Sequence, residues 1–155
     1  MNEEYITNSS EETQKLGADF SQALKGGDFL AFYGELGSGK TTFIQGLAKG
    51  LGITRRIISP TFIIVRSYEL KLKMQNSKFK NKIKNAKFFY HIDLYRAESK
   101  HDLLSVGLDQ IIQDQDNIIA LEWAERLGEM LPEKRIDLHF EYLGDNKRRI
   151  TIKHI

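Results

Sequence analysis

The sequence of 155 residues contains no cysteine, which excludes disulfide bridges and metal sites with thiolate ligands. No apolar run approaches the roughly 20 residues of a membrane-spanning helix. No N-terminal apolar stretch follows a basic segment, as it does in a secretory signal peptide. We therefore expect a cytoplasmic protein without a membrane segment. The length predicts a single domain, residues 1–155, with a core large enough to fold alone.

Acidic residues are missing from residues 71–87, which hold seven lysines. The whole chain carries a formal net charge of +2, so the remainder is acidic overall. Seven lysines without an acid are difficult to bury, because each buried charge needs a partner. We expect this lysine-rich segment to be an exposed, mobile hairpin insertion between two strands.

The most informative pattern is Gly34-Glu35-Leu36-Gly37-Ser38-Gly39-Lys40-Thr41, which matches the phosphate-binding loop G-x-x-x-x-G-K-[ST] at every fixed position. An apolar run of strand length precedes it, and apolar residues at helical spacing follow it. Glycines let backbone N–H groups turn toward phosphate oxygens, and the helix N-terminus adds positive potential. Lys40 can reach the β- and γ-phosphates, and the Thr41 hydroxyl can ligate Mg²⁺. The alternative is a glycine-rich turn that fits by chance.

The rest of the chain alternates between strand and helix patterns. We expect helices at residues 10–24 (capped by Ser9 or Ser10), 41–51 and 100–112, and a short helix or turn at residues 122–131. We expect strands at residues 5–7, 29–33, 62–68, 88–92, 118–121, 136–143 and 149–155, the last two forming a hairpin joined at residues 144–147. This order predicts an α/β wound sheet of the P-loop NTPase type, with a mostly parallel centre, antiparallel edge strands and a C-terminal hairpin.

In such a sheet a ligand binds at the C-terminal ends of the strands, where the loop would meet Asp93 and Glu122. Both acids end apolar strands, so they can hold Mg²⁺ through its waters and position an attacking water. Either acid alone could instead cap a helix. A hydroxyl of Ser59-Pro60-Thr61 could sense the γ-phosphate, although an ordinary turn explains that segment better from its position. The four histidines show no metal-ligand spacing and are expected to be structural or surface residues.

Motifs that read guanine are absent. The nearest match to Asn-Lys-x-Asp is Asn146-Lys147-Arg148-Arg149, in which arginine replaces the aspartate. The Asp-x-x-Gly switch is also missing, because Asp93-Leu94-Tyr95-Arg96 ends in arginine. We therefore expect the nucleotide to be ATP and not GTP.

Four segments in this order and spacing resemble the bacterial TsaE (YjeE) family: residues 34–42, Ser59-Pro60-Thr61-Phe62, His91-Ile92-Asp93-Leu94-Tyr95-Arg96 and Leu121-Glu122-Trp123-Ala124-Glu125-Arg126. The resemblance covers nearly the whole chain. It implies the Mg-dependent ATPase of the machinery that forms threonylcarbamoyladenosine in tRNA, which is not itself the transferase. It further implies the partners TsaD and TsaB, and ATP hydrolysis that resets the TsaD–TsaB complex. The tRNA would be contacted indirectly, through that complex.

The resemblance also implies roles by position. The phosphates would be bound by Gly37, Ser38, Gly39, Lys40, Thr41 and Thr42. Thr41 and Glu122 would hold Mg²⁺, and the catalytic set would be Thr61, Asp93 and Glu122. Trp123 would lie beside the nucleotide, and the N-terminal segment around residues 7–13, including Ser10, would lie near the adenine.

The lysine-rich segment departs from the family, whose members make a short turn there. It is either a dispensable loop or an electrostatic tether to tRNA or to an acidic partner face. Two other functional classes remain. A small-molecule P-loop kinase would need an arginine-bearing lid and a second substrate pocket, and the chain has too little sequence between its strands for such a lid. A non-catalytic nucleic-acid-binding module would leave the phosphate loop unexplained.

Overall fold

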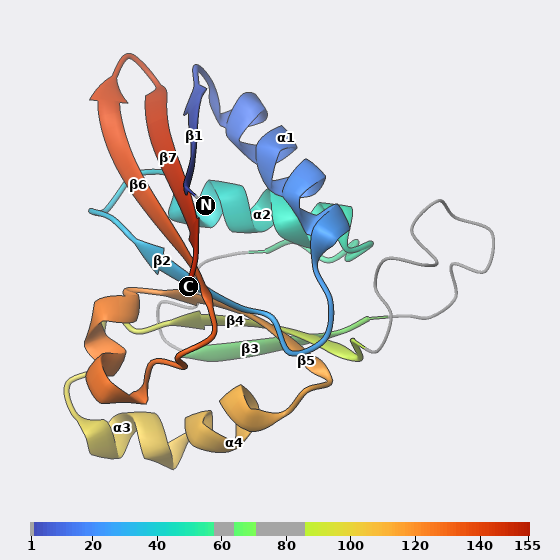
Figure 1. The fold of residues 1–155 in the computed structure, drawn as a ribbon, viewed down its shortest axis with the longest axis vertical. Helices are drawn as coiled ribbons and strands as arrows, with labels where there is room; N and C mark the ends of the chain where they lie inside the picture. The colour runs from blue at the N-terminus through green and yellow to red at the C-terminus, as the bar shows by residue number, and fades with distance from the viewer. Residues whose placement is uncertain (1, 58–63, 71–85) are drawn as a thin grey trace.

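The computed structural model describes residues 2–57, 64–70 and 86–155. The Ser59-Pro60-Thr61 turn, and with it the predicted catalytic Thr61, lies outside the described residues, as does nearly all of the lysine-rich segment. The described chain forms a seven-stranded sheet with helices on both faces (Figure 1). None of its described helices is long and apolar enough to cross a membrane.

The sheet has a parallel centre and antiparallel edges, as predicted. Its strands are β1 (Asn2–Thr7), β2 (Phe29–Tyr33), β3 (Val65–Glu69), β4 (Phe88–Asp93), β5 (Asn117–Glu122), β6 (Ile136–Gly144) and β7 (Lys147–His154). They lie in the order β1-β7-β6-β2-β5-β4-β3. The pairs β6–β2, β2–β5 and β5–β4 are parallel, whereas β1–β7, β7–β6 and β4–β3 are antiparallel.

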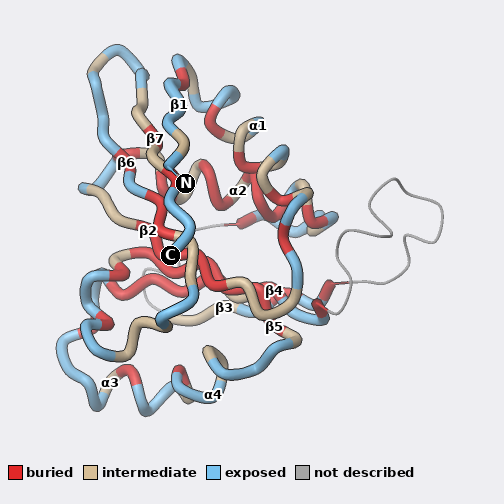
Figure 2. Tube along the Cα trace, in the orientation of Figure 1, coloured by how far each residue is buried: buried red, intermediate tan, exposed pale blue. Residues whose placement is uncertain are grey.

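The central strands are continuous apolar runs because both faces of the sheet are covered. Every residue of β5 is buried, and β2 is buried through its first four residues; both strands lie in the red centre of Figure 2. Leu30 and Phe32 face one core, which includes Phe43 and Leu47. Phe29 and Ala31 face the other core, beneath the opposite layer of helices.

Helices α1 (Ser10–Phe20) and α2 (Lys40–Gly50) cover one face, and α3 (Lys100–Ser105) and α4 (Leu108–Gln113) cover the other (Figure 1). Ser9 is the N-cap of α1, since its side chain accepts from the Glu12 backbone N–H at 3.1 Å. Helices α1 and α2 approach each other closely at glycine residues. A Cβ at Gly46 would overlap the backbone carbonyl of Gln14.

The prediction of continuous helices was wrong at two places. The α-helix predicted for residues 10–24 ends at Phe20, and a 3₁₀ turn, η1 (Ser21–Ala23), follows. Its Ser21 hydroxyl donates to the Ala18 carbonyl at 2.6 Å and so competes with the backbone ladder. The helix predicted for residues 100–112 is two helices, because Gly107 takes a left-handed conformation with φ of 71°, which ends α3.

Other element boundaries also differ from the prediction; β1, for example, begins at Asn2 and β7 at Lys147. The short helix or turn predicted at residues 122–131 is a 3₁₀ segment, η2 (Ala124–Met130), which starts later than predicted because β5 extends through Glu122. The described part of the strand predicted at 62–68 begins at Val65. The C-terminal hairpin turns on Asp145 and Asn146 alone, both with positive φ, as in a type I′ turn.

Candidate functional site

The predicted strand–loop–helix unit is present. Its loop joins β2 to α2, which begins at Lys40. Gly39, the residue before the helix, has φ of 109°, a backbone conformation that side-chain-bearing residues rarely adopt. This conformation lets the chain turn directly into α2, so the positive end of the helix lies at the loop.

The Lys40 ammonium folds back over its own loop. Its Nζ donates to the carbonyls of Gly34 and Glu35, the latter at 3.1 Å, and lies 4.3 Å from the ring centroid of Trp123. Lys40 is only 5% exposed. Burial lowers its pKa below the usual 10.5, and nearby carboxylates, led by Glu122, act against that shift. The site therefore holds a desolvated cation, which attracts an anion more strongly than a hydrated one does.

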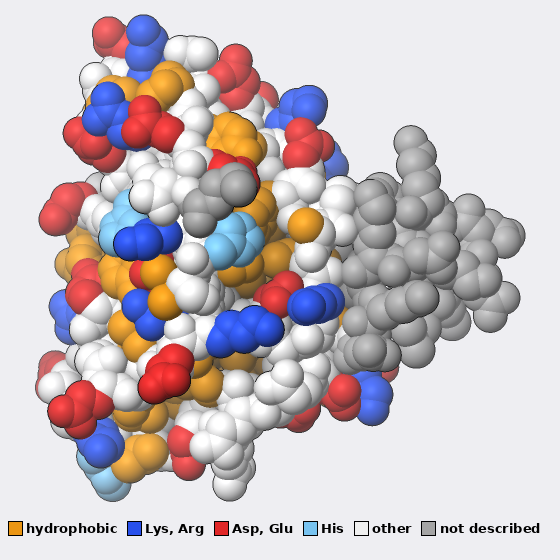
Figure 3. All heavy atoms as spheres, viewed as in Figure 1, with side chains coloured by type: hydrophobic (Ala, Val, Ile, Leu, Met, Phe, Trp, Pro, Cys, Tyr) orange, Lys and Arg blue, Asp and Glu red, His pale blue; other side chains and the backbone are white. Residues whose placement is uncertain are grey.

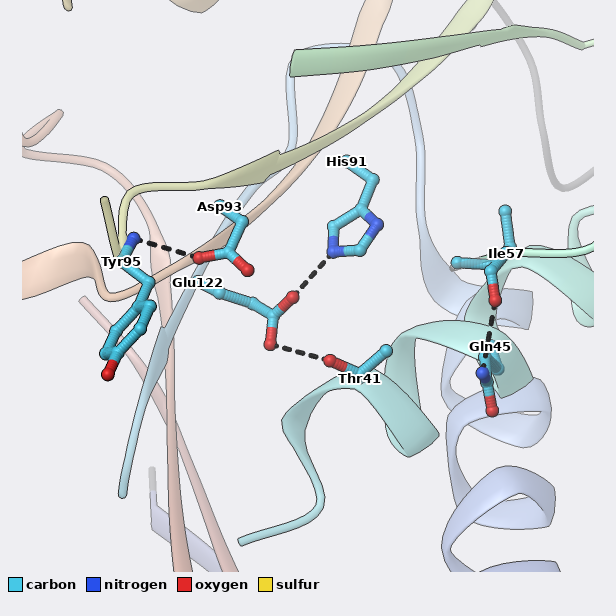
Figure 4. Close-up of polar contacts among 7 residues, drawn as sticks. All are labelled: Thr41, Gln45, Ile57, His91, Asp93, Tyr95 and Glu122. Carbon is cyan, nitrogen blue, oxygen red and sulfur yellow. Dashed lines mark hydrogen bonds and ion pairs between the residues drawn. The ribbon is translucent and has the colours of Figure 1, made fainter. Parts of the chain in front are cut away.

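Glu122 connects the loop to the interior of the sheet (Figure 4). Thr41 donates from Oγ1 to Glu122 Oε1 at 3.0 Å. The second carboxylate oxygen, Oε2, lies 2.6 Å from His91 Nε2. His91 is completely buried, and its Nδ1 has no hydrogen-bond partner among the described residues. The chain Thr41–Glu122–His91 fixes both oxygens of one carboxylate.

Asp93 lies beside Glu122 because they are cross-strand neighbours at the ends of the parallel strands β4 and β5. The Asp93 carboxylate accepts from the Tyr95 backbone N–H at 2.9 Å (Figure 4). This contact holds the aspartate at the end of its strand. The predicted meeting of two strand-end acids at the phosphate loop is therefore present.

Trp123 closes the site from the η2 side. Its backbone is left-handed, with φ of 60° and ψ of 46°. Its ring lies 5.1 Å from the ring of Tyr95, and the Arg126 guanidinium lies 5.8 Å from it. These contacts place the tryptophan ring at the rim, next to the Lys40 ammonium.

The loop and the strand ends enclose a pocket of about 330 Å³. All the predicted site residues except Thr61 and Ser10 line this pocket. The lining residues among them are Gly37, Ser38, Gly39, Lys40, Thr41, Thr42, Asp93, Glu122 and Trp123. Thr61 is outside the described residues. Ser10 is the exposed first residue of α1 and is not among the pocket-lining residues, so its contact with adenine stays a prediction.

Sequence reasoning missed two residues. His91 showed no metal-ligand spacing, yet it stands two positions before Asp93 on the same face of a strand, and this spacing was a usable signal. Arg148 also lines the pocket. It comes from the far end of the chain, and no local pattern distinguishes it from Arg149.

A mixed α/β sheet, a phosphate loop that opens a helix and two strand-end acids define a protein of the P-loop class. The family model described as "Threonylcarbamoyl adenosine biosynthesis protein TsaE" matches residues 7–150. The chain belongs to the TsaE family.

Individual relatives agree with this assignment. The tRNA threonylcarbamoyladenosine biosynthesis protein TsaE of Bacillus subtilis is 36% identical over 145 residues, which are 94% of this chain and 81% of that protein. The protein of the same name from Treponema pallidum is 31% identical over 95% of this chain and 97% of its own length. The crystal structure of Bacillus subtilis YdiB superposes with a TM-score of 0.75 at 30% identity, covering 100% of this chain and 86% of that one. TsaE proteins are involved in the biosynthesis of threonylcarbamoyladenosine in tRNA.

Proposed function

We propose that this protein binds ATP and hydrolyses it with Mg²⁺, as the ATPase component of the machinery that forms threonylcarbamoyladenosine in tRNA. One observation carries the proposal: Lys40, Thr41 and Glu122 line a single pocket with residues 35–39 of the phosphate loop. A protein that needed this loop only as a turn would have no use for a buried cation beside two strand-end carboxylates.

The loop residues fit a polyphosphate. Backbone N–H groups at the start of α2 and the Lys40 ammonium would bind its oxygens. The Ser38 hydroxyl is buried without a hydrogen-bond partner among the described residues. A buried polar group without a partner is costly, and a phosphate oxygen bound in the loop would offer the acceptor.

The residues also fit Mg²⁺, which prefers oxygen ligands and usually takes one or two from protein carboxylates. Thr41 and Glu122 would hold the ion, which when bound neutralises charge that develops on the transferred phosphoryl group. His91 keeps the Glu122 carboxylate in place. Asp93, anchored by the Tyr95 N–H, would accept a hydrogen bond from the attacking water and orient it.

For partners we propose TsaD and TsaB, in the cytoplasm, with hydrolysis resetting their complex and with tRNA reached through it. On the face drawn in Figure 3, acidic and basic side chains are interspersed over the described residues, so this face is not a basic patch. Nucleic-acid-binding faces usually gather Lys and Arg into one patch.

The test compares nucleotide binding and hydrolysis by the wild type, Lys40→Ala and Lys49→Ala, each alone and with TsaD and TsaB. Lys49 is an exposed lysine on the same helix and serves as the matched control. Lys40→Ala should cost about 1.5–3 kcal/mol of binding free energy, whereas Lys49→Ala should bind as the wild type does. A wild type that binds no Mg-ATP, forms no ATP-dependent complex, or passes phosphate to a small metabolite instead of water would overturn the proposal.

A further inference from the structure

Two adjacent arginines at the start of β7 have different surroundings. Arg149 forms ion pairs with Glu141 at 2.9 Å and with Glu4 at 3.6 Å. Arg148 has no carboxylate within ion-pair distance among the described residues, and its Nη1 donates only weakly to the Lys147 carbonyl, at 3.4 Å. Neighbouring residues on a strand point to opposite faces, so the two cations serve different surfaces.

The Arg148 side chain lies against the phosphate loop. A Cβ built on Gly39 would be 3.2 Å from Arg148 Nε and 3.3 Å from its Cδ, and Arg148 lines the pocket together with Lys40. On its other side the guanidinium lies 4.4 Å from the ring centroid of Tyr142. The tyrosine ring therefore supports a half-buried cation at the loop.

The geometry of the β6–β7 hairpin orients the Arg148 side chain. Tyr142 pairs with Arg148 and Gly144 pairs with Lys147, which leaves Leu143 as an extra residue on β6. An extra residue of this kind is a β-bulge, and bulges next to active sites redirect the side chains beside them. The tight turn at residues 145–146 fixes the register, and pairing of Arg148 with Thr7 holds the other edge of β7.

We propose that Arg148 is a second cationic contact for the nucleotide phosphates, supplied by the C-terminal hairpin opposite Lys40. The inference rests on the proposed ATP binding. The pocket is lined by three carboxylates, on Glu35, Asp93 and Glu122, and by two cations besides Arg148, on Lys40 and Arg96. Two cations do not balance three carboxylates and a polyphosphate as well. A guanidinium with planar, forked donors matches phosphate oxygens. An arginine whose charge is not used by a carboxylate keeps its donors for a ligand.

The experiment measures Kd for ATP, ADP and adenosine with the wild type, Arg148→Met, Arg148→Lys and Arg149→Met. Methionine keeps an unbranched stem against Tyr142 and removes the charge. Arg148→Met should weaken ATP and ADP about 10- to 100-fold and leave adenosine unchanged. Arg148→Lys should recover part of the affinity. Arg149→Met should bind all three ligands within about twofold of the wild type.

The outcomes separate this inference from the proposed function. If the wild type binds ATP and Arg148→Met, folded by circular dichroism, binds it equally well, Arg148 is not a phosphate contact although the protein still binds ATP. An equal loss for adenosine and ATP would assign Arg148 to the base or ribose and would also overturn the inference. If the wild type binds no nucleotide, both proposals fail.

Discussion

The contact between His91 and Glu122 gives a quantitative prediction. Nε2 and Oε2 lie 2.6 Å apart, and the two side chains are 0% and 3% exposed. A hydrogen bond to a charged group contributes about 1.5–3 kcal/mol to stability, and removing one partner also leaves the other buried with an unsatisfied polar atom. We expect His91→Phe to lower the free energy of unfolding by about 2–4 kcal/mol.

A double-mutant cycle isolates the pair. It compares His91→Phe, Glu122→Leu and the double variant by urea unfolding monitored with circular dichroism. The double variant should lose about 1.5–3 kcal/mol less than the sum of the single losses. For a chain of this length each kcal/mol should move Tm by about 2–4 °C, so thermal melts provide an independent check. A coupling energy below about 0.5 kcal/mol would refute the reasoning, because the buried contact would then contribute nothing specific.

The same variant tests whether His91 positions Glu122, the proposed metal ligand. If His91 acts by holding Glu122, His91→Phe should weaken nucleotide binding in the presence of Mg²⁺ and leave binding in EDTA close to the wild-type value. His91→Gln, whose amide can donate to the carboxylate, should recover part of the Mg²⁺-dependent affinity. Equal losses with and without Mg²⁺ would indicate general damage to the pocket, which contradicts a positioning role.

Three further predictions follow from other contacts. Trp123 is the only tryptophan and its ring lies next to the Lys40 ammonium, so Mg-ADP should change its fluorescence; flat emission in a titration that saturates by calorimetry would place the nucleotide elsewhere. Gly46→Ala should lower the free energy of unfolding by about 1–3 kcal/mol, because the new methyl group overlaps a backbone carbonyl of α1, whereas the exposed Lys49→Ala should stay within about 0.5 kcal/mol. Burial lowers the pKa of Lys40, so as the pH rises the ammonium should lose its proton, and nucleotide affinity should begin to fall, before the pH reaches 10.5. A fall that starts only at the ordinary lysine pKa would contradict the desolvated site.

The phosphate loop and the strand-end acids could be predicted because their signals are local. The loop must have glycine where the backbone turns and an apolar strand before it, and both features are contiguous in the sequence. Asp93 and Glu122 each end an apolar run, and parallel pairing brings the ends of such runs together at one edge of the sheet. Knowing the sheet type was therefore enough to place both acids.

The remaining differences depend on contacts that no local pattern records. The apolar stripe in residues 100–112 suits one helix, and only the left-handed Gly107 divides it. Arg148 and Arg149 are chemically identical neighbours, and their surroundings differ only when β6, β1 and the loop are in place around them. His91 was interpreted without its partner because Glu122 lies 31 residues away.

The glycine contacts between α1 and α2 have a mechanical consequence. At Gly17 and Gly46 each helix lies directly on the backbone of the other, with no side chain between them to change rotamer. Close-packed interiors transmit displacement with little compression, so the two helices should move as one body. Because α2 begins at Lys40, a force applied to the N-terminal helix would reach the phosphate loop without being absorbed on the way. The exposed face of α1 is thus mechanically coupled to the phosphate loop through α2.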